Sequence, residues 1–426
     1  MRRRVIIIGA GASGMMAAIQ AARAGGDVTI MEHRERPGKK LLSTGNGRCN
    51  MTNLEQKKEC YRCSNEGFPE TVLRQFPVGD TLSFFEGLGI LPKSRNGYIY
   101  PNSDQAVSVL EALTQELERL KVRIRCQCQV ERITKEGREF AVISGQGVFR
   151  GEALILSAGS RAAPVTGSDG SGYDLAAAFG HRLIPPLPAL VQLRCEEKHY
   201  RQLAGIRTEA RVSLYVGEKL LAQDEGELQI TDYGISGIPT FQISRYAAVA
   251  LHRRQKVTVR IGFLPRMKEE EIRALMERRR QSMEERTAIQ WMNGLLNSKL
   301  SLVLLKLAGI QEKQKVKTLS RVQWDQLFRQ ITAYETRVCG VNSFEQAQVC
   351  CGGVDTRQVQ ATLESKLVKN LYFCGEILDV DGICGGYNLQ WAWSSGAVAG
   401  REAAKGEGQE ERDPTSGDGG RRKDKR

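Results

Sequence analysis

Outside its first residues, the 426-residue chain has no run of roughly 18 uninterrupted apolar residues, the length needed for a membrane-spanning helix. Its 11 cysteines are an odd number and lack the regular spacing of a disulfide framework, which is typical of a reducing cytosol. The CxxC motif Cys60–Cys63 has no second pair beside it, so it is weak evidence for a zinc or redox centre. We therefore expect a cytoplasmic protein with no membrane insertion and no bound metal.

The N-terminus could be mistaken for a signal peptide, because MRRRVIIIGAGASGMMAAIQAARA has a basic start, an apolar run and small residues near its end. Its glycines, however, fall at spaced positions that a simple apolar segment does not need. A second apolar run, Val28–Met31, also follows it. The segment is therefore interpreted as the start of a folded domain.

The pattern of this segment is that of a dinucleotide-binding turn. Val5–Ile8 predicts a strand, and Gly9, Gly11 and Gly14 then open an Ala-rich helix. Gly9 permits the turn, Gly11 lets the backbone approach a pyrophosphate, and Gly14 lets the helix pack on the strand. The next strand ends at Glu32, 18 residues after Gly14, where a carboxylate can accept a ribose hydroxyl.

The rest of the chain divides by pattern. An alternating run over Val122–Val130 predicts a half-buried strand, and the apolar run Ala153–Leu156 predicts another. From about Pro188 the character changes to alternating segments and charged helices, and a Gly-rich α/β pattern returns after Val349. We predict a nucleotide-binding domain formed by residues 1–187 and 339–404, an insert over 188–338, and a disordered tail over 405–426.

The net charge of +13 is concentrated in one internal segment. Leu251–Gln330 contains 18 Lys and Arg against 8 Asp and Glu, an excess of ten positive charges. The segment forms either solvated helix faces or a surface that attracts an anionic substrate or cofactor tail.

Two further Gly-rich stretches suit a cofactor. HRERPGKKLLSTGNGRCNMTN, residues His33–Asn53, is dense in glycine, cations and small donors that can face a phosphate-bearing, redox-active ring. GEILDVDGICGGYN, residues Gly375–Asn388, is acidic and opens a helix near the end of the chain.

With PVTGSDGSGY from Pro164 and GELQITDYGISGIP from Gly226, these motifs resemble the flavoprotein family that includes BaiN and YhiN, also labelled aminoacetone oxidase-like. The resemblance runs from Arg4 to about Glu402. It implies an α/β fold in which a glutathione-reductase-like FAD-binding Rossmann domain carries an inserted β-barrel and a helical domain. The chain departs from the family at Asp232, where histidine is common, and at Ile238, where proline is common.

Carried over by position, the resemblance implies a set of FAD contacts along the chain. The residues are Gly9, Gly11, Ala12, Ser13 and Gly14 at the pyrophosphate, Glu32 at the adenosine ribose, Lys39, Lys40, Gly45 and Asn46 on the flavin side, Val130 at adenine, Ala158 and Gly159 under the cofactor, Gly375, Glu376 and Asp379 at the ribityl chain, and Gly386, Asn388 and Leu389 at the isoalloxazine. The positive end of the last helix would stabilise negative charge on the reduced flavin.

The sequence has no second GxGxxG with its own strand and helix, so NAD(P)H is expected to dock transiently as the hydride donor. BaiN-type relatives imply reduction of conjugated C=C bonds in 3-oxo-4,6-diene bile acid CoA intermediates, during secondary bile acid formation. The expected partner is then an anionic steroid acyl-CoA and not a nucleic acid. Tyr233 and Tyr387 are candidate proton donors, with a structural role as the alternative for each, and the catalytic residue stays unassigned.

Two other functions stay open. A flavin amine oxidase of the aminoacetone type would pass electrons to O2 and need no nicotinamide. A non-catalytic flavin-binding regulatory or nucleic-acid-associated protein would use the basic segment alone, and salt-sensitive binding to arbitrary DNA without turnover would indicate it.

Overall fold

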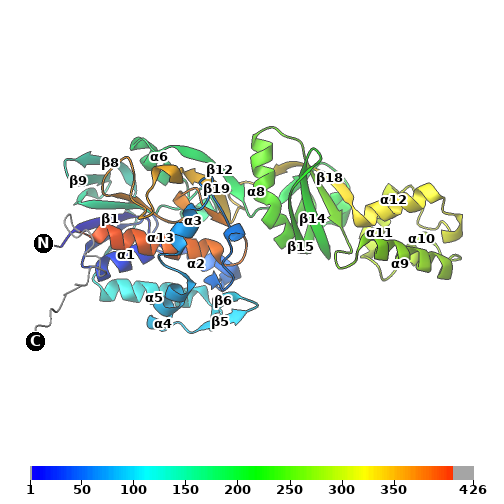
Figure 1. Ribbon diagram of the computed structural model, residues 1–426, viewed down its shortest axis with the longest axis horizontal. Helices are drawn as coiled ribbons and strands as arrows, with labels where there is room; N and C mark the ends of the chain where they lie inside the picture. Colours follow the sequence, from blue (N-terminus) through cyan, green and yellow to red (C-terminus); the bar gives the residue numbers. More distant parts are fainter. Residues whose placement is uncertain (1, 406–426) are drawn as a thin grey trace, which may run out of the picture.

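A computed structural model describes residues 2–405 and shows three parts arranged along one long axis (Figure 1). The part that contains both chain ends lies on one side, a barrel lies in the middle, and a group of helices lies at the far end. Apart from Lys405, the predicted tail over 405–426 lies outside the described residues. Within residues 2–405, no helix is both long enough and apolar enough to cross a membrane.

A five-stranded parallel sheet forms the centre of the first part. Ile7 on β1 pairs with Ile155 on one side and with Ile30 on the other, and the apolar run of β1 is buried, as in a sheet covered on both faces. The strands, in spatial order, are β20 (Leu371–Phe373), β11 (Ala153–Leu156), β1 (Arg4–Ile8), β2 (Asp27–Met31) and β7 (Arg123–Arg125). The strands predicted around β1, β2 and β11 are confirmed.

Helices α1 (Ala12–Arg23) and α13 (Tyr387–Ala404) lie side by side against this sheet (Figure 1). Their backbones touch through glycines of α13. A Cβ atom on Gly396 would lie 2.4 Å from the Ser13 carbonyl oxygen, and one on Gly400 would lie 2.2 Å from the Ala17 carbonyl oxygen. Only glycine fits at these two positions, so the C-terminal helix is held directly against the N-terminal one.

The single strand predicted over Val122–Val130 is two strands. β7 ends at Arg125, and β8 (Val130–Glu136) begins after a break in which Gln127 has a φ of 53°. β8 continues into an antiparallel sheet with β9 (Glu139–Ser144) and β10 (Gly147–Gly151). Burial alternates from Val122 through the break to Val130, which is why the sequence pattern does not reveal the break.

Smaller elements surround the first part. They are α2 (Lys39–Ser43), β3 (Thr52–Asn53), β4 (Tyr61–Arg62), α3 (Phe68–Leu73), α4 (Val78–Gly87), β5 (Pro92–Arg95), β6 (Tyr98–Pro101), α5 (Ala106–Arg119), α6 (Ser171–Ala178) and β21 (Asp381–Gly382).

The chain leaves the first part through β12 (Leu183–Ala189) and returns through β19 (Val349–Val354), and these two strands pair antiparallel. Between them lies a closed six-stranded barrel with its own buried core. In spatial order its strands are β13 (Leu193–Cys195), β16 (Gly234–Gly237), β15 (Lys219–Thr231), β14 (Arg207–Val216), β17 (Val257–Gly262) and β18 (Tyr334–Val341). The inserted β-barrel implied by the resemblance is confirmed.

Helices complete the insert. α8 (Ile238–His252) follows β16 and lies between the barrel and the first part of the molecule (Figure 1). The far end is formed by α9 (Glu269–Ser282), α10 (Ala288–Met292), α11 (Ser298–Leu307) and α12 (Arg321–Thr332). Trp291 and Trp324 pack edge to face in their core, with ring centroids 5.0 Å apart.

The close contact of α13 with α1 predicts a large cost for one methyl group. We expect Gly400→Ala to lower the free energy of unfolding by about 2 kcal/mol, because the added Cβ must displace the Ala17 backbone. Gly79→Ala on α4 is the matched control, since its Cβ would meet no atom within 4 Å and should leave stability unchanged or slightly higher. Denaturant unfolding of both variants measures the difference, and equal stabilities would contradict the packing argument.

Candidate active site

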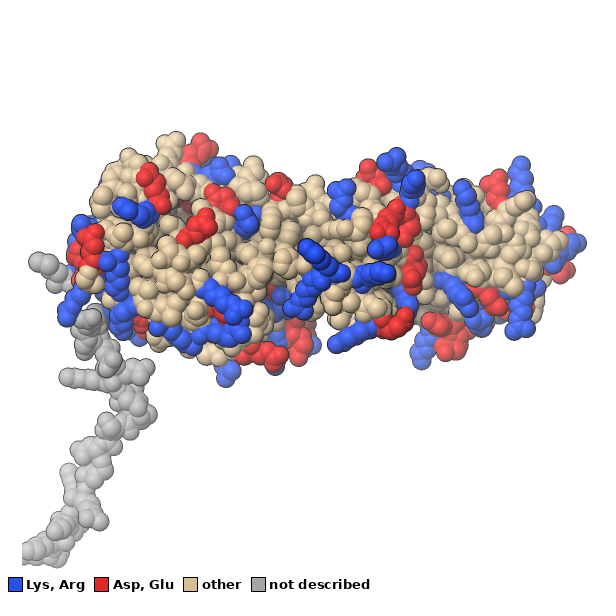
Figure 2. Space-filling view, turned by 90° about the horizontal axis from the view of Figure 1, so that it is seen from above, with Lys and Arg blue, Asp and Glu red and all other residues tan. Residues whose placement is uncertain are grey.

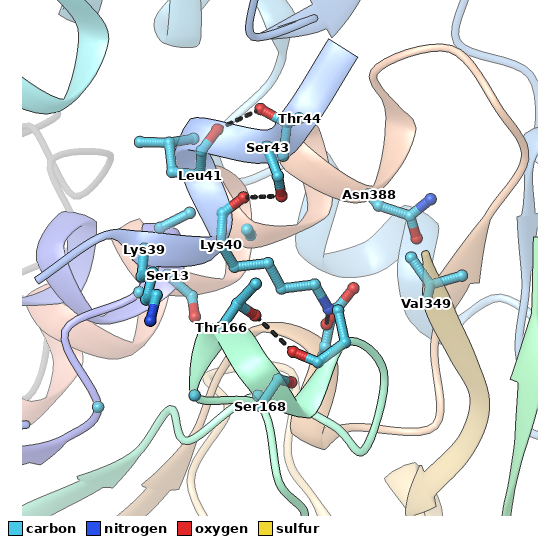
Figure 3. A pocket seen from close by; sticks show the side chains of 18 of the residues that line it. Ser13, Lys39, Lys40, Leu41, Ser43, Thr44, Thr166, Ser168, Val349 and Asn388 are labelled. Carbon is cyan, nitrogen blue, oxygen red and sulfur yellow. Dashed lines mark hydrogen bonds and ion pairs between the residues drawn. The ribbon is translucent and has the colours of Figure 1, made fainter. Parts of the chain in front are cut away.

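A cavity of about 660 Å³ opens at the carboxyl ends of β1, β2 and β11 (Figure 3). Ile8, Met31 and Ser157, at or directly after the ends of these strands, line its floor. The C-terminal segment and the insert complete its walls. This is the edge at which open parallel sheets bind their ligands.

The start of α1 is shaped for an anionic group. Gly9 has a φ of 101°, and a Cβ there would lie 2.6 Å from the Ser157 carbonyl oxygen, so the turn requires glycine. Gly11 has an ordinary φ of −78°, and a Cβ there would meet no protein atom within 4 Å. Its missing side chain therefore leaves room in the cavity, above N–H groups of α1 that no side chain caps.

Glu32 lies at the end of β2 with only 8% of its surface exposed. Its Oε2 accepts a hydrogen bond from the Ala10 N–H at 2.8 Å, and its Oε1 accepts one from the Arg34 N–H at 2.8 Å. The carboxylate thus joins the Gly-rich turn to the loop after β2, and it also lines the cavity. A buried acceptor in this position suits a ribose hydroxyl.

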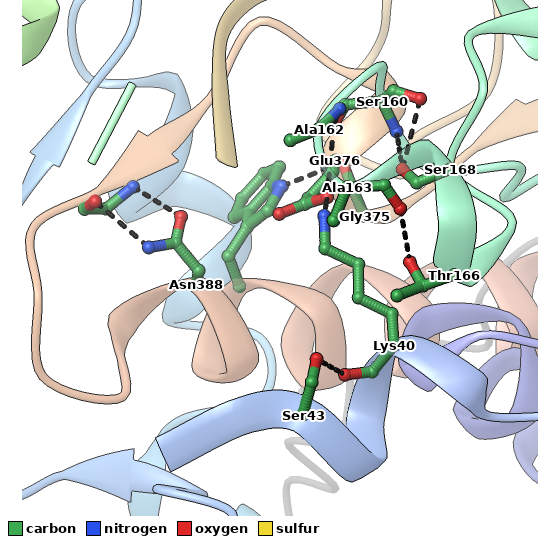
Figure 4. Close-up of polar contacts among 12 residues, drawn as sticks. Lys40, Ser43, Ser160, Ala162, Ala163, Thr166, Ser168, Gly375, Glu376 and Asn388 are labelled. Carbon is green, nitrogen blue, oxygen red and sulfur yellow. Dashed lines mark hydrogen bonds and ion pairs between the residues drawn. The ribbon is translucent and has the colours of Figure 1, made fainter. Parts of the chain in front are cut away.

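Lys40 extends from α2 across the cavity, near Thr166 and Ser168 (Figure 3). Its Nζ lies 2.5 Å from Oε2 of Glu376, which also accepts a hydrogen bond from Ser160 Oγ at 3.2 Å (Figure 4). The pair joins the N-terminal loop to the C-terminal segment. Because the two charges compensate each other, both can line a partly enclosed cavity.

The start of α13 faces the same cavity. Gly386 precedes it with a φ of 93°, and no side chain caps its first N–H groups. The Asn388 side chain accepts from the Gly382 N–H at 2.8 Å and donates to the Gly382 carbonyl at 3.0 Å (Figure 4). Asn388 therefore holds the preceding loop in place, and the free N–H groups of α13 can stabilise a second negative charge.

An apolar wall closes the end of the cavity toward the insert. It is formed by Leu190, Ile238, Phe241, Val349 and Ile383. Ile238, at the start of α8, is 57% exposed although it is a large apolar side chain. Sequence reasoning singled out Ile238 as a departure from the family, but it did not assign Leu190, Phe241, Val349 or Glu345–Gln348 to the site, because these residues lie where the two parts of the chain join.

Most residues that the resemblance assigned to the cofactor line this cavity. They are Gly9, Gly11, Ala12, Ser13, Glu32, Lys39, Lys40, Gly45, Asn46, Val130, Ala158, Gly159, Glu376, Gly386, Asn388 and Leu389.

Gly14, Gly375 and Asp379 are not among the lining residues. A Cβ on Gly14 would lie 2.0 Å from the Gly9 carbonyl oxygen, and one on Gly375 would lie 2.3 Å from Ser13 Oγ, so both glycines serve close packing behind the cavity. Asp379 is buried, and its Oδ2 accepts from the Ser64 N–H at 3.0 Å. This differs from the implied ribityl contact, because the chain turns after Glu376 and directs the Asp379 carboxylate away from the cavity.

The two candidate proton donors also lie outside the lining. Tyr387 is buried and packs edge to face on Tyr61 with ring centroids 5.7 Å apart, and burial raises the pKa of its hydroxyl. Tyr233 Oη accepts from Asn342 Nδ2 at 2.8 Å. Within the described residues, each tyrosine thus makes a packing or hydrogen-bond contact outside the cavity lining.

Neither the CxxC motif nor the basic segment contributes to the cavity surface. Burial raises the pKa of Cys63 to about 11, which keeps its thiol protonated near neutral pH. Lys and Arg side chains of the barrel and helical parts alternate with Asp and Glu on the face shown in Figure 2. On that face the cations lie among acidic side chains, and no residue of Leu251–Gln330 lines the cavity.

Known proteins are similar to this chain over most of its length. A family model described as "HI0933-like protein Rossmann domain" matches residues 3–402. The 3-dehydro-bile acid delta(4,6)-reductase of Clostridium scindens is 46% identical over 94% of this chain and 99% of that protein. The ribosomal RNA dihydrouridine synthase of Haemophilus influenzae is 32% identical over 92% of this chain and 96% of that protein. A solved 3-ketosteroid-delta4-(5alpha)-dehydrogenase from Rhodococcus jostii RHA1 aligns over 95% of this chain and 100% of its own, with 14% identity and a TM-score of 0.46.

The position of Glu32 predicts its effect on dinucleotide binding. We expect Glu32→Gln to weaken binding of FAD about ten-fold or more, because an amide nitrogen would face one of the two backbone N–H groups. Glu35→Gln, on the exposed loop nearby, is the control and should bind as the unaltered protein does. Fluorescence titration of the apoprotein with FAD measures both, and an unchanged affinity for Glu32→Gln would remove Glu32 from the site.

Proposed function

This chain belongs to the HI0933-like family of FAD-dependent oxidoreductases, and from this premise we propose that it reduces C=C bonds conjugated to the ketone of 3-oxo bile acids. The observation that carries the proposal is the 46% identity, over nearly the whole of both chains, to a reductase of 3-dehydro-bile acids. The apolar wall of the cavity supports it, since a steroid is a flat apolar molecule.

The residues around the cavity fit FAD. The space above Gly11 and the uncapped start of α1 suit the pyrophosphate, and Glu32 suits the adenosine ribose. The start of α13 suits the isoalloxazine, because its free N–H groups stabilise negative charge at the pyrimidine edge. When bound, FAD supplies hydride transfer between a reduced donor and the conjugated double bond.

The chain itself contributes orientation and exclusion of water. Ile238 and Phe241 come from α8 of the insert, while Val349 and Ile383 come from the two returning segments, and all four line the same cavity as the start of α13. A steroid held against this wall would keep its reacting carbons beside the flavin. Exclusion of water by these side chains strengthens every electrostatic contact inside the site.

The donor, the form of the substrate and the compartment belong to the same proposal. NAD(P)H donates hydride and docks transiently, because the sequence has a single dinucleotide-binding turn. The substrate is an anionic steroid acyl-CoA, whose charged tail extends out of the cavity toward the basic insert. All 11 cysteines are free in the described residues, which supports the reducing cytoplasm as its place of action.

A second candidate function is reduction of uridine in ribosomal RNA. It is supported by the 32% identity to a ribosomal RNA dihydrouridine synthase and by the ten excess positive charges of Leu251–Gln330. The C5=C6 bond of uracil is also conjugated to a carbonyl, so one flavin site can serve either reaction. The apolar wall favours the steroid over a polar nucleobase.

An anaerobic titration tests the proposed function. We expect NADH or NADPH to bleach the visible flavin band, and a 3-oxo-4,6-diene bile acyl-CoA to restore it within one turnover. Ribosomal RNA and aminoacetone are the competing substrates in parallel samples. Reoxidation by the RNA alone would establish the uridine reductase, and bleaching by aminoacetone without nicotinamide would establish an amine oxidase.

The exposed position of Ile238 allows a test of the apolar wall with little risk to folding. We expect Ile238→Ala to raise the KM for the steroid about five-fold and to leave FAD affinity unchanged, since about 1 kcal/mol of apolar contact is lost. Val322→Ala, which truncates a still more exposed apolar side chain on the remote helix α12, is the control. A KM that stays constant in both variants would place the steroid elsewhere.

A further inference from the structure

The loop Asp381–Gly386 connects the insert-facing side of the molecule to the start of α13. Its last four residues, Ile383–Gly386, line the cavity directly beside the uncapped end of that helix. Three contacts within the nucleotide-binding part hold this loop. Asn388 binds Gly382, and the Ile383 N–H donates to the Cys60 carbonyl at 3.0 Å. Asn53 Nδ2 donates to the Gly385 carbonyl at 3.1 Å.

The insert holds the same loop from the opposite side through α8. Gln242 Oε1 accepts from the Cys384 N–H at 3.0 Å. Three residues further along α8, Arg245 Nη2 lies 3.0 Å from Asp381 Oδ1. Because residues three apart lie on one face of a helix, α8 holds the loop both at its first residue, Asp381, and at Cys384.

The Arg245–Asp381 pair is unusually well enclosed for charged groups. The side chain of Asp381 is 2% exposed and that of Arg245 is 19% exposed. Arg62, whose backbone pairs with that of Asp381, adds a second cation, and both guanidinium groups lie 5.6 Å from the centroid of the Tyr246 ring. Loss of either partner would leave a buried charge with less compensation, so the pair favours the docked position of α8.

The same helix therefore has two tasks. Its first turn presents Ile238 and Phe241 to the cavity, and its next turn holds the loop that borders the cofactor end. A displacement of α8 would therefore change the shape of the apolar wall and the position of the loop together.

We propose that Arg245 and Asp381 are positioning residues through which the insert holds the loop Asp381–Gly386 against bound FAD. The docking of the insert then determines how tightly the protein binds FAD and what surrounds the flavin. It also determines the shape of the apolar wall. This inference rests on the FAD site and not on the identity of the substrate.

The test measures flavin binding in full-length variants. We expect Arg245→Met and Asp381→Asn each to raise the Kd for FAD about ten-fold and to shift the visible absorption of the bound flavin. The double variant should lose no more than either single variant, because the two residues act through one contact. Arg245→Lys keeps the charge with a single donor group and should lie between Arg245→Met and the unaltered protein.

Arg253→Met provides the matched control, since Arg253 caps the end of the same helix in an exposed position. It should leave the Kd and the spectrum unchanged. If Arg245→Met does not fold, the near-isosteric Asp381→Asn and the charge-keeping Arg245→Lys decide the matter in the same assay. Unaltered FAD affinity and spectrum in folded variants of this pair would overturn the inference, and would leave the proposed steroid reduction untouched because no substrate enters the measurement.

Discussion

The site depends on one close contact, that between the backbones of α1 and α13. At Gly396 and Gly400 the two helices approach so closely that a single Cβ atom would collide with carbonyl oxygens of α1. This contact places the uncapped starts of two helices, 375 residues apart in sequence, on one cavity. Two partial positive charges from helix ends then serve one long anionic cofactor at two points.

The insert completes what the nucleotide-binding part leaves open. Through α8 it supplies Ile238 and Phe241 to the apolar wall, and through Arg245 it grips the loop before α13. The cavity is thus located where the two parts of the molecule meet. The basic helices at the far end of the insert lie away from this junction and contribute no residue to the cavity lining.

Short sequence motifs predict the local structure at the start of the chain, because the interactions that form it are local. The strand, the Gly-rich turn and Glu32 follow from backbone freedom and strand length. Gly9, Gly11 and Glu32 line the cavity, while Gly14 packs behind it. Asp379 shows what a motif does not predict, namely the direction of a side chain. Its segment lines the cavity at Glu376, yet three residues later the carboxylate is turned toward Ser64, because the direction of a side chain depends on packing that no motif encodes.

The sequence by itself determined the family, the dinucleotide turn and the interruption of one domain by another. These features rest on residue spacing and on hydrophobic period, which act over a few turns of chain. Only the tertiary structure decided which residues form the apolar wall and which charged pair joins the insert to the loop Asp381–Gly386. No sequence motif indicates the roles of Leu190, Phe241, Arg245 and Asp381. These residues acquire their roles because the barrel docks α8 against the returning end of the chain.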